Sequence, residues 1–205
     1  MTEALVLQQP PLAQQLVLLF HGVGATAQDL APLGRRIAAE FPHAVVASIP
    51  APDASDLGGG RQWFSVRGVT EQNRPARVQE TLPRFLATVQ DWQRQSGLGA
   101  AQTILVGFSQ GAIMALASSA AAQPPAARVV SLSGRFDQLP SSAPVGVRFH
   151  FIHGEQDPVI PASHAEGAVK RLQELGVPAT LDLVPGLAHG IDQRVLAALL
   201  ASLRE

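Results

Sequence analysis

The sequence GFSQG at residues 107–111 has the spacing Gly-x-Ser-x-Gly around Ser109, which is typical of a serine nucleophile. The residues TILVGF before Ser109 are typical of a buried strand, and QGAIMALASSA after it is typical of a helix. A serine on such a turn takes a strained backbone, so the residues two positions away must be very small, as Gly107 and Gly111 are. The start of the helix directs free N–H groups toward the hydroxyl. This context favours a nucleophile over a glycine-rich turn in which Ser109 only caps the helix.

A serine nucleophile needs a histidine base, which in this strand-turn-helix arrangement follows the serine and an acidic residue along the chain. Four histidines follow Ser109: His150, His153, His164 and His189. His189 is favoured, because it lies in a loop after the last expected strand and can reach Ser109 from there. His150 and His153 fall on opposite faces of one strand, which argues against a shared metal site. His153 is expected to be a structural, hydrogen-bonded residue, and His164 is expected to be exposed.

Asp157 is the favoured acidic residue. It follows the expected strand VRFHFI, and Pro158 restricts it to an extended backbone in a rigid loop. A buried carboxylate at this place can accept the imidazole N–H and fix the tautomer of the base. The other candidates are Asp137, Glu155, Asp182 and Asp192. Asp182 lies inside a strand and Asp192 is typical of a helix N-cap, so Asp137 is the main alternative residue. The other alternative is that Asp157 only forms a turn before Pro158 and has no catalytic role.

Acyl transfer also requires N–H donors for the negatively charged oxygen of the intermediate. One expected donor is the backbone N–H of Gln110, directly after the nucleophile, and the other is the backbone N–H of Val23. Val23 lies in the sequence HGVG at residues 21–24, where glycines allow a close approach of the backbone after an early strand. A phosphate loop is excluded, because the third glycine of Gly-x-Gly-x-x-Gly and the Gly-Lys-Ser/Thr of a P-loop are both missing.

A long excursion, Pro50–Arg74, carries the sequence GGGRQWFS and is too long for a simple connector. We expect it to fold over the site. Trp63 and Phe64 within it are candidates for substrate binding as the wall of an acyl pocket. They serve equally well as anchors that hold the excursion on the core, and the residues alone do not separate these two interpretations.

Six apolar, β-branched segments predict strands, and helical patterns fall between them. The expected strands are 16–20, 44–49, 103–108, 128–133, 147–152 and 179–184; the expected helices are 26–40, a long helix from Pro75, 110–121, 163–175 and 192–204. Pro83 is expected to kink or restart the long helix. Alternating strands and helices predict an α/β fold: one mainly parallel sheet with helices on both faces.

Composition excludes several other classes of protein. Of the 205 residues, 46% are hydrophobic and 15% charged, which predicts a large core rather than disorder. The net charge of −1 gives no attraction to nucleic acid, and without cysteine there is no thiol nucleophile or thiolate metal site. We expect no metal, no cofactor and no integral membrane association. The start of the sequence lacks signal-peptide features, so a cytoplasmic protein is expected.

Taken together, the motifs resemble the phospholipase/carboxylesterase family of α/β-hydrolases over nearly the whole chain. The blocks that carry the resemblance are LVLLFHGVGA, SIPAP, RQWF, GFSQGA, LSG, IHGEQDPVIP and AHGI, and three of them most resemble the YpfH-type esterase branch. The resemblance implies Ser109, Asp157 and His189 as catalytic triad and so favours Asp157 over Asp137. It also implies the N–H groups of Val23 and Gln110 as the oxyanion hole. The family's tryptophan segment usually continues with an acidic residue, where this chain has Ser65.

These observations predict a single α/β-hydrolase domain over residues 1–205, without a separate cap domain. The expected activity is hydrolysis of short- or medium-chain carboxylic esters through an acyl-enzyme. An acyl-protein thioesterase or a lysophospholipase uses the same machinery and is the nearest alternative. A non-catalytic binder of a small hydrophobic ligand is the alternative of another class. The expected partner is a small-molecule ester or thioester, and the expected state is a monomer or homodimer.

Overall fold

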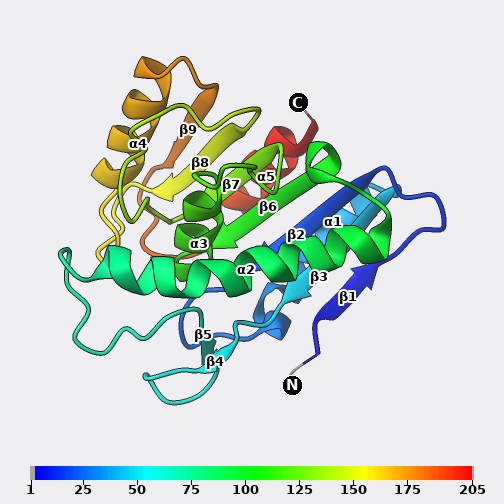
Figure 1. Cartoon of the computed structure of the whole chain (residues 1–205), viewed down its shortest axis with the longest axis horizontal. Helices are drawn as coiled ribbons and strands as arrows, with labels where there is room; N and C mark the ends of the chain where they lie inside the picture. Colours follow the sequence, from blue (N-terminus) through cyan, green and yellow to red (C-terminus); the bar gives the residue numbers. More distant parts are fainter. Residues whose placement is uncertain (1–2, 205) are drawn as a thin grey trace.

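The computed structural model describes residues 3–204 and is built around one seven-stranded sheet (Figure 1). The strand order is β1-β3-β2-β6-β7-β8-β9, in which β1 pairs antiparallel with β3 and all other neighbours are parallel. The strands are β1 (Leu5–Gln8), β2 (Gln15–Phe20), β3 (Ala44–Ile49), β6 (Thr103–Phe108), β7 (Arg128–Leu132), β8 (Arg148–Gly154) and β9 (Ala179–Val184). The α/β fold with a mainly parallel sheet is thereby confirmed.

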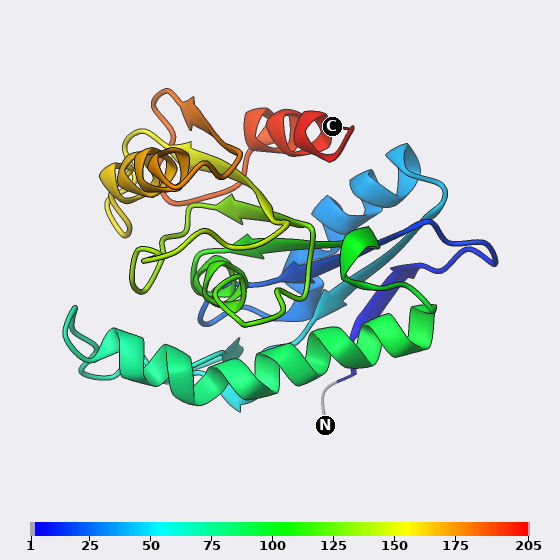
Figure 2. The ribbon, with the colours of Figure 1, turned by 45° about the horizontal axis from the view of Figure 1, so that its top comes forward.

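Helices cover both faces of this sheet, which is why its central strands are apolar almost throughout. Helices α1 (Ala31–Glu40) and α5 (Gln193–Arg204) pack on one face. Helices α2 (Arg74–Ser96), α3 (Gln110–Ser118) and α4 (Ser163–Glu174) pack on the other, and Figure 2 shows α2 and α5 on opposite sides of the twisted sheet. Two hydrophobic clusters result, one on each side of the sheet.

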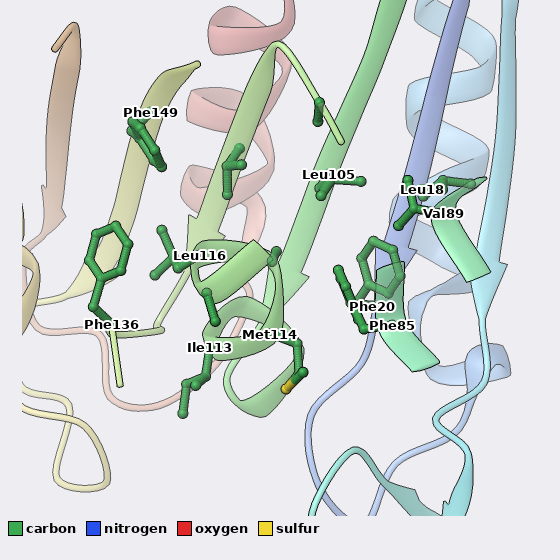
Figure 3. Close-up of a cluster of buried hydrophobic side chains, with 14 of the residues drawn as sticks. Leu18, Phe20, Phe85, Val89, Leu105, Ile113, Met114, Leu116, Phe136 and Phe149 are labelled. Carbon is green, nitrogen blue, oxygen red and sulfur yellow. The ribbon is translucent and has the colours of Figure 1, made fainter. Parts of the chain in front are cut away.

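Strand β2 illustrates how one sequence serves both clusters. Its side chains alternate, so Leu18 and Phe20 lie with α2 and α3 while Val17 and Leu19 lie with α1 and α5. Figure 3 shows the first of these clusters, where Phe20 meets Phe85 of α2 with ring centroids 4.5 Å apart. Burial of this kind stabilises the sheet on both sides and holds the carboxyl ends of its strands in a fixed arrangement.

The structure differs from the sequence-based expectations at several boundaries. Helix α2 continues through Pro83 instead of restarting there, because Phe85 and its other apolar residues keep the helix packed on the sheet. The proline costs one main-chain hydrogen bond, since it has no N–H to donate. Helix α3 ends at Ser118, three residues before the expected Ala121. The expected helix at 26–40 begins as a 3₁₀ turn, Ala27–Leu30, before α1.

Four further elements were not predicted: an edge strand, the two strands of a hairpin and a 3₁₀ turn. Strand β1 forms the edge of the sheet and pairs antiparallel with β3. Its sequence LVLQ is too short to be recognised as a strand. The excursion Pro50–Arg74 contains a small hairpin of β4 (Asp53–Ala54) and β5 (Arg61–Gln62). Another 3₁₀ turn, Ala100–Gln102, leads from α2 into β6.

Candidate active site

Ser109 stands between the end of β6 and the start of α3, with the left-handed backbone angle φ of 52° that L-residues rarely adopt. The turn is tight enough to demand its two glycines. A Cβ atom on Gly107 would lie 2.4 Å from the backbone of Ala112, and one on Gly111 would lie 2.2 Å from the carbonyl oxygen of Phe20. The sequence expectation of very small residues at both positions is confirmed.

Three residues from separate loops form one chain of hydrogen bonds at the carboxyl end of the sheet. His189, in the loop after β9, places Nε2 2.9 Å from Oγ of Ser109. Its other ring nitrogen, Nδ1, lies 2.7 Å from Oδ2 of Asp157, in the loop after β8. The structure therefore brings together the serine, histidine and aspartate that the sequence singled out.

The hydrogen bonds fix the positions of the protons along this chain. A carboxylate can only accept, so Nδ1 of His189 carries the proton and Nε2 is free to accept the hydroxyl proton of Ser109. Burial raises the pKa of Asp157, but hydrogen bonds from His189 and from the N–H groups of Ile160 and Val159 outweigh it, and the net pKa is lowered. The Asp157 side chain therefore stays ionised beside the imidazole.

A second histidine contacts the same carboxylate. His153 is fully buried, and its Nε2 donates to the carbonyl oxygen of Ile160 at 2.7 Å while lying 3.3 Å from Oδ2 of Asp157. The expectation of a structural, hydrogen-bonded His153 is confirmed, but its contact with Asp157 was not foreseen. The spacing of four residues offers no signal for it, because the contact depends on how the loop after β8 folds back.

The remaining candidates lie outside this chain of hydrogen bonds. Asp137 is half-buried, its pKa is raised by burial, and it is hydrogen-bonded to Gln79. His150 is hydrogen-bonded to Oγ1 of Thr180 on the neighbouring strand. The prediction for His164 was wrong: it is half-buried and lines the hollow that contains Ser109, because the loop after β7 lies over it.

The loop after β2 lies directly beside Ser109. A Cβ atom on Gly22 would lie 3.1 Å from Cβ of Ser109, so the close approach depends on that glycine. Val23 and Gln110 line the same hollow as Ser109. Within residues 3–204, neither the N–H of Val23 nor that of Gln110 has a hydrogen-bond acceptor in the protein, which leaves both available to a ligand.

His21 holds this loop in place. It is fully buried, and its Nδ1 lies 2.7 Å from the carbonyl oxygen of Gly22, so Nδ1 must carry the proton. Its Nε2 then accepts the N–H of Ala51 at 3.0 Å. This arrangement requires a neutral ring, in agreement with a pKa that burial lowers.

The Gln110 side chain connects the turn at Ser109 to the excursion. Its Oε1 accepts the N–H of Trp63 at 2.8 Å, and its Nε2 donates to the carbonyl oxygen of Phe64 at 2.7 Å. Trp63 is buried between Phe20 and Phe85, and its indole N–H donates to the carbonyl oxygen of His21. Phe64 instead lines the hollow at Ser109. Both aromatic residues are buried in the same core cluster, and of the two only Phe64 also borders the site.

The hollow itself has a volume of about 490 Å³ and two kinds of wall. Apolar side chains make up most of it: Val23, Phe64, Val66, Val69, Ile113, Val159, Ile160 and Pro161. Besides Ser109 and Gln110, the rest is a charged group, Glu71, Arg74 and Arg135, together with the imidazole of His164. This charged group was not predicted from the sequence. Glu71 and Arg74 are three residues apart, but Arg135 is 64 residues from Glu71, and no spacing signals that they form a site.

Two further observations concern metal binding and membrane insertion. Among the described residues, no group of three or more His, Cys, Asp or Glu side chains is placed to hold a metal ion. No helix in residues 3–204 is long and apolar enough to cross a bilayer.

Comparison with known proteins places this geometry in a family. The model of the phospholipase/carboxylesterase family, an α/β-hydrolase family, matches residues 1–205. Esterase YpfH of Escherichia coli K12 is 47% identical over 200 residues, which cover 97% of this chain and 86% of that protein.

Solved structures agree. Esterase PE8 superposes with a TM-score of 0.86 at 34% identity, covering 94% of this chain and 92% of its own. The Bacillus cereus carboxylesterase has a TM-score of 0.83 at 14% identity over 100% of this chain and 94% of its own, a likeness of fold. The chain therefore belongs to the phospholipase/carboxylesterase family of α/β-hydrolases and is an esterase-type enzyme.

Proposed function

We propose that Ser109, His189 and Asp157 are the catalytic triad of a carboxylic-ester hydrolase that works through an acyl-enzyme. The observation that carries this proposal is the continuous chain of hydrogen bonds from Asp157 through His189 to the hydroxyl of Ser109. Nε2 of His189 accepts the hydroxyl proton as Ser109 Oγ attacks the ester carbonyl. Asp157 stabilises the imidazolium that forms, and its lowered pKa keeps it charged for that purpose.

The second half of the reaction uses the same groups. The imidazolium of His189 protonates the departing alcohol, and water then attacks the acyl group on Ser109 with His189 again as base. The free N–H groups of Val23 and Gln110 support their assignment as donors to the oxyanion in both steps. Each such donor contributes a factor of about 10²–10³ in turnover when it is placed on the developing charge.

The hollow of about 490 Å³ fits the proposed preference for short- and medium-chain acyl groups. Phe64 is proposed as part of its wall, while buried Trp63 acts on the substrate only by holding Phe64 in position. A thioesterase or lysophospholipase activity would use the same residues. The printed name of the Escherichia coli relative, an esterase, supports the oxygen ester as first choice.

Replacing Ser109 by alanine tests the proposal. Turnover of para-nitrophenyl butyrate by Ser109→Ala is expected to fall by about three orders of magnitude or more. Ser118→Ala is the matched control, because Ser118 lies on α3, is fully buried and only donates to the carbonyl oxygen of Ala115. An alkyl fluorophosphonate should label the wild type and Ser118→Ala but not Ser109→Ala.

The same experiment separates the alternatives. Absence of both labelling and hydrolysis of any ester or matched thioester would favour a non-catalytic binder, and full activity of Ser109→Ala would overturn the mechanism. Comparison of an oxygen ester with the thioester of the same acyl group decides between esterase and thioesterase activity.

A further inference from the structure

One end of the hollow at Ser109 is lined by a pair of arginines that share one carboxylate. Arg135, in the loop after β7, donates from Nη1 and Nη2 to the two oxygens of Glu71 at 3.0 and 2.7 Å. Arg74, at the start of α2, donates from Nη1 to Oε1 of Glu71 at 2.6 Å. The arginine side chains are only 16% and 13% exposed, so their positions are restricted by packing rather than free in solvent.

The charges on this wall do not cancel. The hydrogen bonds from Arg74 and Arg135 lower the pKa of Glu71 to about 2, so Glu71 carries a full negative charge at neutral pH. Arg135 Nη1 lies 3.1 Å from Nε2 of His164, and a guanidinium can donate only to a neutral imidazole. Burial, and next the charge of Arg135, lower the pKa of His164. Of the described residues that line the hollow, two are therefore positive and one is negative.

Asp137 is the other acidic group close to Arg135. Its pKa is raised by burial and lowered in part by the charge of Arg135. It is not among the residues that line the hollow, so the surface that faces a ligand keeps a surplus positive charge.

Arg74 has donors to spare. A guanidinium has five N–H groups, and within residues 3–204 only Nη1 of Arg74 is directed at an acceptor of the protein. A partly buried guanidinium with unused donors, placed beside an apolar wall, is suited to bind a carboxylate that arrives with a substrate.

We propose that Arg74 and Arg135 form a subsite for a monoanionic group, so that the preferred substrates are esters that carry an ionised carboxylate elsewhere in the molecule. The carbon chain would lie on the apolar wall that includes Val66 and Ile113, with the ester at Ser109 and the carboxylate at the arginines. A single negative charge matches the surplus of one, whereas a phosphate dianion exceeds it. This inference rests on the proposed ester hydrolysis at Ser109.

The test compares esters of equal length that differ in one charge. The charged substrates are the para-nitrophenyl half-esters of adipic and suberic acid, and the neutral ones are para-nitrophenyl hexanoate and octanoate. The wild type is expected to prefer the charged ester of at least one pair in kcat/KM. Arg74→Gln is expected to reduce this preference about tenfold, the usual effect of losing one charge-assisted hydrogen bond.

Three other variants test the proposed subsite further. Glu71→Gln removes the competing carboxylate and is expected to increase the preference for the charged ester. Arg84→Gln is the matched control, because Arg84 also lies on α2 and also pairs with a carboxylate, that of Asp53, but does not line the hollow at Ser109. Arg84→Gln should leave the preference unchanged, and Arg74→Lys should retain part of it.

Each outcome has one meaning. Equal kcat/KM for charged and neutral esters at both lengths overturns the subsite, as does an Arg74→Gln variant that loses activity on both equally. Hydrolysis of the neutral esters with no charge preference leaves the triad intact and removes only the subsite. No hydrolysis of any ester by the wild type removes the proposed function itself. The preference should also weaken in about 1 M salt, where screening acts over about 3 Å.

Discussion

The hollow at the amino ends of the strands is larger than the hollow that contains Ser109, with about 630 Å³ against about 490 Å³. The larger one is bordered by the residues where strands begin, among them Gln15, Thr103, Arg128 and Arg148. The smaller one is bordered by a strained serine, two unpaired backbone N–H groups and a cluster of charges. Size therefore does not identify the site. Parallel strands gather loops and helix N-termini at their carboxyl ends, and the chemistry gathers with them.

Replacement of the proposed histidine base is expected to give the largest difference in activity between a variant at the carboxyl end of the sheet and one at its amino end. His189→Ala is expected to lower kcat on para-nitrophenyl butyrate by about three orders of magnitude or more, because no base remains to accept the proton of Ser109. His43→Ala is the control, since His43 is exposed and directly precedes β3 at the amino end of the sheet. Comparable losses in the two variants would contradict the assignment of the carboxyl end.

The two hollows are also expected to differ in how much an added methyl group at a neighbouring glycine lowers the free energy of unfolding. Gly111→Ala is expected to destabilise the protein by about 2–3 kcal/mol, because the added Cβ meets the backbone of Phe20. Gly176→Ala, at the larger hollow, meets no atom within 4 Å and should cost only about 1 kcal/mol for its φ of 72°. Urea unfolding midpoints of both variants measure the difference. An equal cost at both positions would mean that the turn at Ser109 is less tightly packed than described.

Filling each hollow with an indole tests which one receives the substrate. Val66→Trp narrows the hollow at Ser109 and is expected to lower kcat/KM about tenfold, the usual scale for a lost binding contact. Ala143→Trp places the same group in the larger hollow and should leave kcat/KM unchanged. A loss of activity in Ala143→Trp would show that the larger hollow takes part in catalysis.

The smallest effect concerns pH and stability. Burial lowers the pKa of His21 below its ordinary value of 6.5, so the unfolded chain binds more protons than the folded one just below that pH. The stability contributed by neutral His21 is complete above pH 6.5 and is lost as the pH falls below it, at up to about 1.4 kcal/mol per pH unit. The free energy of unfolding of the wild type, measured with urea at several pH values between about 7.5 and 5.5, should show this slope.

His21→Asn removes this ring and is expected to reduce the slope to the part contributed by His164, whose pKa burial also lowers. His43→Asn, at the exposed amino-end position, should keep the slope of the wild type. A wild-type stability that rises as the pH falls from 7.5 would have the opposite sign to the one expected for a buried neutral histidine.

Much of the fold and the central hydrogen-bonded residues could be predicted from the sequence because their signals are local. The run TILVGF, the small residues around Ser109 and the order of serine, aspartate and histidine are all visible along the chain. Strand β1 was not predicted, because its apolar run LVL, followed by Gln8, is shorter than the runs of the central strands.

The charged wall could not be predicted for a different reason. Glu71 and Arg135 are separated by 64 residues. They meet only because the segment before α2 and the loop after β7 both lie at the carboxyl end of the sheet. The hydrogen bonds between Gln110 and the excursion likewise depend on how a long loop folds back, which no spacing encodes. Residues of this kind become visible only when topology has placed them.

The left-handed backbone of Ser109 has an evolutionary consequence. Glycine adopts a φ of 52° without the penalty that serine bears there, so replacing Ser109 by glycine should yield a more heat-stable protein without activity. Selection for thermal robustness alone would thus drive the chain toward losing its proposed nucleophile. The proposed reaction supplies a selective reason to keep serine at this position in spite of that penalty.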